Sequence, residues 1–541
     1  MLRFQWHDVR TPLFICIWMI VILIAKLLFH SNKGGWKAPD SALLIIAGFC
    51  VGTILDVFLP HEVYLDPDLF FLYLLPPIAL EAGYFVPNRL FFQNLGTIIT
   101  YAVAGTLFNI IAIGLTLYAF SPLYSVDISL IDLMLFSTLI SAVDPVAVLS
   151  VFTEINVNEL LYICVFGESL LNDAVTIVLY HSLSSMAMIG GDNLVLNDFV
   201  WASGSFFLVS IGGVLIGIIG AALTGYMTRL TKDLDHTQPL TCLLVPYVAY
   251  LVSESAHFSG ILAIMVCGLL MKPYIRHNMS EDALITVKYF LKTIASHSEA
   301  MIFIFLGFST FSRNHNWDFW FIGVTLVSCF VYRFLGTYLF SAIVNCRRQE
   351  RIGLVDQFIM AYGGLRGAIC YGLVMSVDKE SLPAKDMFVS TTVVVIIFTV
   401  FLQGTTMKPL VQFLQVKRSE TQRNKTITQI LLQHIQEDTM AGIEAIVGIH
   451  GRHFWHQKLT KFDRELVRPF MTAKETSRGD DIVEKYTRAQ VSEIKAHLLA
   501  VEPTTGVGSR DGLHLPMNPT PPLKKLSVAQ TQTKDDGDSN V

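Results

Sequence analysis

Four polar side chains lie within one otherwise apolar run, Phe166-Gly167-Glu168-Ser169-Leu170-Leu171-Asn172-Asp173-Ala174. On a helix with 100° per residue, Glu168, Ser169, Asn172 and Asp173 fall within about 140° and form one stripe. Asp173 offers a carboxylate, Asn172 an amide carbonyl and Ser169 a hydroxyl, and a small hard cation such as Na⁺ prefers oxygen ligands of this kind. The stripe therefore predicts an ion site. A hydrogen-bonded packing cluster between helices is the alternative.

Two further motifs predict interrupted helices. The run 141–145 (SAVDP) contains Pro145, which removes a backbone donor and disfavours helix at Asp144. Asp144 would begin the second half-helix, where its negative charge would offset the positive N-terminal end of that half-helix. The alternative is that Pro145 only kinks a continuous helix. The run 363–367 (GGLRG) places Gly363 and Gly364 beside Arg366 and predicts a second break. Such irregular backbone is tolerated at membrane depth only where it is buried in protein or lines a cavity.

Three more charges occur inside apolar runs. Arg333 needs an acidic partner there, and Glu168 is the one we predict, because an uncompensated buried charge is costly. Glu81, after a proline pair, and Glu299 are further candidate buried acids.

The composition explains why these charges matter. Of 541 residues, 52% are hydrophobic and 15% charged, with mean hydropathy +0.52 and net charge −5. Soluble domains carry about 25% charged residues, so the composition argues against a soluble enzyme and against a disordered scaffold. No basic excess suggests a nucleic-acid partner. No nucleophile–base pair, zinc motif or phosphate loop stands out, so we expect neither enzyme activity nor a cofactor.

The apolar blocks predict an all-α polytopic membrane protein, because about 20 residues cross the hydrocarbon. We predict about 13 (12–13) transmembrane helices, at 13–29, 41–59, 69–85, 97–120, 128–152, 161–186, 201–228, 239–252, 258–271, 286–310, 317–344, 357–377 and 388–412. The first span could instead be a signal sequence, and the short eighth and ninth are the weakest. With the seventh span as a linker, the interrupted fifth and twelfth spans occupy equivalent positions in two inverted six-helix repeats.

Loop charges favour a cytosolic C-terminus. The inner loops then carry most of the loop Lys and Arg, whereas the outer loops hold only Arg313, Lys379 and Lys385. The sequons at Asn278 and Asn424 would face the cytosol and stay unglycosylated.

The composition changes after residue 416, so we predict a transmembrane domain over 1–416, a cytosolic regulatory region over 417–501 and a disordered tail over 502–541. A basic edge that could contact anionic lipids is formed by Lys417, Arg418, Arg423 and Lys425. An amphipathic helix that suits either a partner's groove or the membrane domain itself carries Ile427, Ile430, Leu431, Ile435, Ile443, Ile446 and Val447. The last residues, Ser539–Val541, are a weak match to a PDZ-binding end.

Five motifs in order make the chain resemble the sodium/proton exchangers of the cation/proton antiporter superfamily, over roughly residues 40–470. They are FFLYLLPPIALEAGYF (70–85), SAVDPVAVL (141–149), FGESLLNDAVTIVLY (166–180), SEAMIFIFLG (298–307) and YGGLRGAI (362–369). The residues of these motifs are most similar to those of the plasma-membrane branch of the animal exchangers. Position 81 departs from the pattern, because Glu81 stands where the motif usually has Asp.

The resemblance implies a homodimer in which a core domain with two crossed broken helices moves against a dimerisation domain. It makes Asp173 the carboxylate that binds Na⁺ or H⁺, with Asn172 and Ser169 beside it. It also matches Glu168 and Arg333 to the family's core ion pair, and Asp144 and Arg366 to the charges that support the crossing. Residues 425–450 resemble the site for calcineurin-B-homologous EF-hand proteins.

We therefore expect electroneutral antiport of extracellular Na⁺, or Li⁺, for intracellular H⁺ by alternating access, regulating intracellular pH, sodium and cell volume. The expected location is the plasma membrane, with recycling endosomes as a second one. A free aspartate titrates near 3.9, and burial disfavours its charged form, which lets a proton compete with Na⁺. Alternatives are K⁺/H⁺ exchange, a cation channel and a transport-inactive sensor; affinity, set-point pH and inhibitor response are left open by the residues.

Overall fold

The computed structural model describes most of the chain up to residue 472. The described residues are 18–24, 27, 39–58, 67–144, 146–189, 196–232, 234, 236–310, 316–346, 348, 351–377, 382–416, 432, 435–436, 439–440, 442–444, 446–447 and 458–472. The chain divides into two compact units, residues 1–474 and 475–541. The second unit, which includes the predicted tail and Ser539–Val541, lies outside the described residues.

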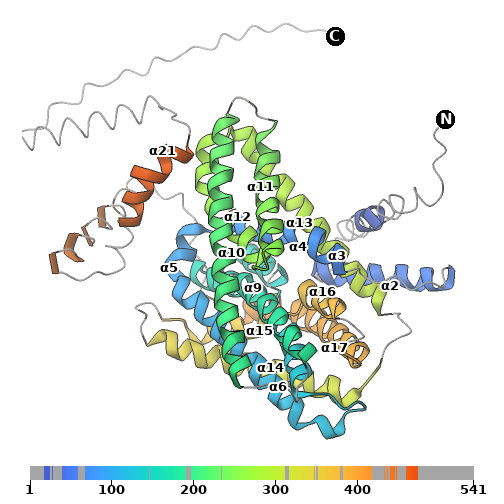
Figure 1. Ribbon diagram of the computed structural model, residues 1–541. Helices are drawn as coiled ribbons and strands as arrows, with labels where there is room; N and C mark the ends of the chain where they lie inside the picture. Colours follow the sequence, from blue (N-terminus) through green and yellow to red (C-terminus); the bar gives the residue numbers. More distant parts are fainter. Residues whose placement is uncertain are drawn as a thin grey trace, which may run out of the picture. The chain divides into compact units, whose positions relative to one another are not determined.

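The described part of the chain is helical and contains no β-strand (Figure 1). Its N-terminal half holds α2 (Asp40–Phe58), α3 (Pro67–Leu69), the π-helical turn η1 (Phe70–Leu74), α4 (Leu75–Phe85), α5 (Asn88–Ile99), the π-helical turn η2 (Thr100–Gly105), α6 (Thr106–Ala119), η3 (Ser121–Leu123), α7 (Leu130–Ser141), α8 (Val146–Ile155), α9 (Glu159–Ile189) and α10 (Leu196–Leu230). Its C-terminal half holds α11 (Gln238–Ser255), α12 (Gly260–Asn278), α13 (Glu281–Ser309), α14 (Phe319–Asn345), α15 (Leu354–Tyr362), α16 (Ala368–Ser376), α17 (Lys385–Phe398), the π-helical turn η5 (Thr399–Gly404), α18 (Thr405–Phe413), η6 (Asp463–Val467) and α21 (Arg468–Met471).

These helices confirm the predicted fold class. Eight helical stretches in the described residues are long and apolar enough to cross a membrane, and shorter apolar helices cover other predicted spans. The weak pair at 239–252 and 258–271 is present as α11 and α12, separated by a short turn. The span predicted at 97–120 begins earlier, at Asn88, because α5, η2 and α6 run on continuously. The number of helices that cross the membrane stays a prediction.

The contacts between the helices define two groups. We call α2, α4, α10, α11, α12 and α13 the first bundle, in which α10 packs on α11 and α12, and α13 packs on α2 and α4. The second bundle contains α5, α6, α7, α8, α9, α14, α15, α16 and α17, in which α6 contacts α7 and α14, and α9 contacts α5, α7 and α8. Contacts between the bundles are fewer and include α13 with α16 and α4 with α9.

Small residues bring helices of the first bundle close together. A Cβ atom on Gly213 or Gly217 of α10 would lie 2.5 or 2.6 Å from the carbonyl oxygen of Ser259 or Ala263. In a membrane, where lipid tails are as apolar as leucine, such close backbone approach supplies much of the packing energy. The α10–α12 contact therefore depends on these glycines.

Both predicted interruptions are present and cross each other. Helix α7 ends at Ser141 and α8 begins at Val146, whereas α15 ends at Tyr362 and α16 begins at Ala368. The Asp144 backbone N–H donates to the Leu365 carbonyl oxygen at 2.9 Å, which joins the two extended stretches directly. Pro145 lies outside the described residues.

Candidate functional site

The polar stripe of α9 faces the crossing of the broken helices. Glu168, Ser169 and Asn172 are buried, and Asp173 is half-buried. Ser169 donates its hydroxyl to the carbonyl oxygen of Val143, in the extended stretch after α7. The stripe is thus a contact surface for the interrupted backbone.

Asn172 is hydrogen-bonded through both ends of its amide. Its Nδ2 donates to the Ser141 carbonyl oxygen at 3.0 Å, at the last residue of α7. Its Oδ1 accepts from the Thr106 hydroxyl at 2.9 Å and from the Thr176 hydroxyl at 3.1 Å. Asn172 therefore satisfies a carbonyl that the helix break leaves free, and it holds α6 and α9 around that end.

Asp173 differs from its neighbours on the stripe. Its Oδ1 atom is enclosed by protein and has no hydrogen-bond partner among the residues that the structure describes. The Asp173 carboxylate also interacts electrostatically with Asp144. Two carboxylates near each other repel at low dielectric, and a buried, unsatisfied carboxylate oxygen is costly, so this position favours a bound cation or proton.

The crossing places opposite charges at the ends of the half-helices. The Arg366 Nη1 atom donates to the carbonyl oxygens of Ser141 and Ala142, each at 3.3 Å, at the C-terminal end of α7. Asp144 packs against Gly367, the residue that precedes α16. A cation at a helix C-terminus and an anion at a helix N-terminus both offset the helix dipole. Asp144 thus lies at the positive N-terminal end of α16, in the other broken helix. It also lies shortly before the N-terminal end of α8, in its own broken helix.

Arg333 and Glu168 form a buried ion pair between α14 and α9. The Arg333 Nη2 atom also donates to the Met360 carbonyl oxygen at 3.2 Å, near the end of α15. A Cβ atom on Gly364 would lie 2.7 Å from the Arg333 Nε atom, so a glycine here lets the guanidinium pass. Gly363 ends α15 and donates its N–H to the Ile359 carbonyl oxygen at 2.8 Å.

The other candidate residues lie elsewhere. Glu81 is half-buried on α4, where Lys292 of α13 acts on it electrostatically, and Glu299 is half-buried on α13, so both belong to the first bundle. In the predicted partner-binding helix, the described residues Ile435, Ile443, Ile446 and Val447 are exposed. Ile427, Ile430 and Leu431, together with the basic edge at 417–425, lie outside the described residues.

Three residues that stabilise the crossing of the broken helices were not predicted from the sequence. Thr106 and Thr176 orient the Asn172 amide, and the Thr399 hydroxyl accepts from the Arg366 backbone N–H at 3.2 Å. Thr176 follows Asn172 by four residues, so helical spacing could have indicated it. Thr106 and Thr399 come from other helices, and no local pattern marks them.

Replacing Gly367 by alanine is expected to destabilise the crossing. The added methyl group would overlap the Asp144 side chain, and overpacking of this kind costs about 1–3 kcal/mol. Thermal unfolding of the purified protein should show a lower Tm. Gly323→Ala on α14 is the matched control, because a Cβ atom there meets nothing within 4 Å. Equal Tm values for the two variants would contradict the predicted overlap.

Comparisons with known proteins agree with this fold. The family model described as sodium/hydrogen exchanger, transmembrane, matches residues 19–413. The structure of the sodium proton antiporter MjNhaP1 from Methanocaldococcus jannaschii superposes with a TM-score of 0.55 at 19% identity, covering 74% of this chain and 99% of that one. At this identity the similarity concerns the fold alone, and it supports the antiporter fold.

Curated relatives match over most of this chain. Sodium/hydrogen exchanger 5 of Homo sapiens is 43% identical over 537 residues, which cover 98% of this chain and 59% of that protein. The probable Na⁺/H⁺ antiporter nhx-9 of Caenorhabditis elegans is 43% identical, covering 90% and 74%. Sodium/hydrogen exchanger 3 of Rattus norvegicus is 44% identical, covering 88% and 58%. The chain thus spans little more than half the length of the two mammalian relatives, and, on the family match over residues 19–413, it belongs to the sodium/hydrogen exchanger family.

Proposed function

We propose that this chain exchanges extracellular Na⁺ for intracellular H⁺, one for one, by alternating access. The observation that carries the proposal is the enclosed Asp173 Oδ1 atom, which lacks a hydrogen-bond partner in the described structure while its stripe neighbours are satisfied. The names of the relatives, sodium/hydrogen exchangers and a probable Na⁺/H⁺ antiporter, support the same choice of ions.

The proposed mechanism is competition for one carboxylate. Either Na⁺ or H⁺ neutralises Asp173, so the loaded site can move through a low-dielectric region, whereas the empty, charged site should not. Asn172 cannot titrate, and its amide is held by three hydrogen bonds, so the pair supplies one exchangeable charge per cycle. Ser169 and Asn172 stand beside Asp173 on α9 and are the candidates for additional Na⁺ ligands.

The two bundles suggest which parts move. The second bundle contains α9 and both broken helices, whereas the first bundle contributes none of the residues around the crossing. Because contacts between the bundles are few, we propose that the second bundle moves against the first and carries Asp173 between the two sides of the membrane.

The wider assignments follow from the family. We propose a homodimer in the plasma membrane with a cytosolic C-terminus, an EF-hand partner of the calcineurin-B-homologous type at residues 425–450 and anionic lipids at the basic edge. The exposure of Ile435, Ile443, Ile446 and Val447 supports an apolar face that a partner could cover. We further propose that transport, not enzymatic turnover, is the activity.

The test is pH recovery in exchanger-deficient cells that express this chain and are loaded with acid. We expect alkalinisation when Na⁺ or Li⁺ is added outside, and none with K⁺. Recovery supported equally by K⁺ would replace the proposal with K⁺/H⁺ exchange. A Na⁺ current through bilayers containing the purified protein would favour a channel, since one-for-one exchange carries no net charge.

A further inference from the structure

The first bundle meets the second through an aromatic ring that is seated on a glycine. Phe70 begins η1, which leads into α4 of the first bundle, and its side chain is fully buried. A Cβ atom on Gly372, in α16 of the second bundle, would lie 2.5 Å from the Phe70 Cε1 atom and closer still to Cζ. Carbon atoms in contact are about 3.5–4.0 Å apart, so only a glycine leaves room for the ring at this position.

The backbone that carries this ring is fixed to α11. The prolines at 76–77 have no N–H, so they cannot pair with the carbonyl groups of Phe71 and Leu72 in the preceding turn. The Tyr250 hydroxyl donates to the Phe71 carbonyl oxygen at 2.8 Å, and the Tyr247 hydroxyl donates to the Leu72 carbonyl oxygen at 3.0 Å. Both tyrosines belong to α11, so η1 is held in the first bundle at two successive residues.

Asp173 lies near this contact. Cys370, two residues before Gly372, interacts electrostatically with Asp173. On α9, the centroid of the His181 ring lies 6.5 Å from that of the Phe71 ring. His181 follows Asp173 along α9, and their spacing in the sequence corresponds to about 12 Å of helix. The turn η1 therefore contacts α16 and α9 on the same side of Asp173, toward the C-terminal ends of both helices.

In the predicted topology this side of Asp173 is extracellular. Helix α16 leads from the crossing toward Lys385, which the loop charges place outside. A second contact between the bundles occurs in α16, where the Tyr371 hydroxyl donates to the Phe305 carbonyl oxygen of α13 at 3.5 Å. The bundles are therefore joined between Asp173 and the extracellular side.

We propose that Phe70 and Gly372 form an extracellular latch between the two bundles. This inference rests on the proposed exchange function, in which the second bundle moves against the first. With the ring on Gly372, the latch is closed and external Na⁺ does not reach Asp173. Because Tyr247 and Tyr250 keep η1 in the first bundle, the movement that exposes Asp173 to the outside takes Gly372 away from the ring.

The first test locks the latch in its closed conformation. Phe71→Cys and His181→Cys are combined, and a short bis-methanethiosulfonate reagent is applied outside cells that express the full chain. We expect cross-linking to reduce Na⁺-dependent recovery from an acid load to the background of cells without the protein, and a reducing agent to restore it. Recovery before cross-linking reports on the exchange function alone, so failure of that function and failure of the latch are distinguished.

The controls use the same reagent. Each single cysteine variant should keep its recovery. Tyr180→Cys with Ser376→Cys is the matched pair, because both residues lie in the second bundle, where their hydroxyl oxygens are 3.2 Å apart. A cross-link between them joins parts that move together and should leave recovery unchanged. Unchanged recovery after a complete cross-link between positions 71 and 181, shown by mass spectrometry, would overturn the proposal.

A change of side-chain size tests the contact itself. Gly372→Ala should disfavour the closed latch, because the added methyl group overlaps the ring, and cross-linking between positions 71 and 181 should slow about tenfold. Phe70→Leu in the same protein makes room for the methyl group and should restore the rate. Gly96→Ala, where a Cβ atom meets nothing within 4 Å, should not change it. Equal rates in Gly372→Ala and its parent, or no restoration by Phe70→Leu, would contradict the latch.

Discussion

Replacing Asp173 by asparagine is expected to abolish Na⁺-driven proton export while the protein remains folded. The variant keeps the size of the side chain and removes the group for which Na⁺ and H⁺ compete. Asparagine is neutral, so it removes the electrostatic repulsion with Asp144 and should not lower stability. In acid-loaded cells, Na⁺-dependent recovery should fall to the background of cells without the protein.

The controls separate transport from folding. Asp132→Asn makes the same chemical change at a half-buried acid in the first turn of α7, and transport should persist there. Surface abundance and gel-filtration behaviour of Asp173→Asn should match those of the wild type. Recovery of pH by a properly folded Asp173→Asn protein would show that another group carries the exchange.

Breaking the Glu168–Arg333 pair is expected to have the largest effect on stability. Removing one member leaves the other charge buried without compensation, which costs about 3–5 kcal/mol. Glu168→Gln and Arg333→Gln should each lower the Tm and the yield of folded protein. The double variant should regain part of the loss, because two neutral side chains no longer leave a lone buried charge.

A surface ion pair provides the comparison. Lys408 and Glu154 also form an ion pair, but the Glu154 side chain is 56% exposed, and such pairs contribute about 0–1 kcal/mol. Glu154→Gln should therefore change the Tm little. If Glu168→Gln were as mild as Glu154→Gln, or if the double variant were worse than both singles, the pair would not be the structural element described above.

Hydropathy and a few special residues could predict most of the architecture. Lipid requires long apolar helices, so the spans follow from composition, and Pro145 with Gly363 and Gly364 indicates where helices must break. The partner of Arg333 could be proposed because a charge at that depth needs compensation. These inferences are possible because an unsatisfied backbone group or an unpaired charge costs much more free energy inside a membrane than in water.

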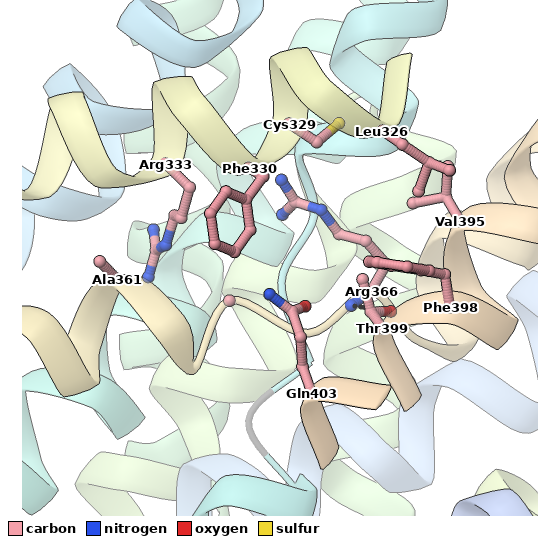
Figure 2. Close-up of a pocket in the computed structure, with 11 residues that line it drawn as sticks. Leu326, Cys329, Phe330, Arg333, Ala361, Arg366, Val395, Phe398, Thr399 and Gln403 are labelled. Carbon is pink, nitrogen blue, oxygen red and sulfur yellow. Dashed lines mark hydrogen bonds between the residues drawn. The ribbon is translucent and has the colours of Figure 1, made fainter. Parts of the chain in front are cut away.

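Contacts between distant helices could not be predicted in the same way. The hydrogen bonds from Thr106 to Asn172 and from Arg366 to Thr399 depend on how neighbouring helices rotate and slide. Asp144 was expected to offset its own half-helix, but its packing on Gly367 requires the crossing geometry of both breaks. A small pocket that is lined by Arg333 of α14 and by Gln403 of η5 (Figure 2) likewise forms only where these two elements lie side by side.

The most direct test of the single shared carboxylate is proton release on Na⁺ binding. Na⁺ is added to the purified protein in weakly buffered solution near its working pH, and a pH indicator reports the protons released. If Na⁺ displaces a proton from Asp173, the wild type should release protons in proportion to bound Na⁺, up to one per site, and Asp173→Asn should release none. Na⁺ binding without proton release, or equal release from the Asp173→Asn protein, would contradict the account.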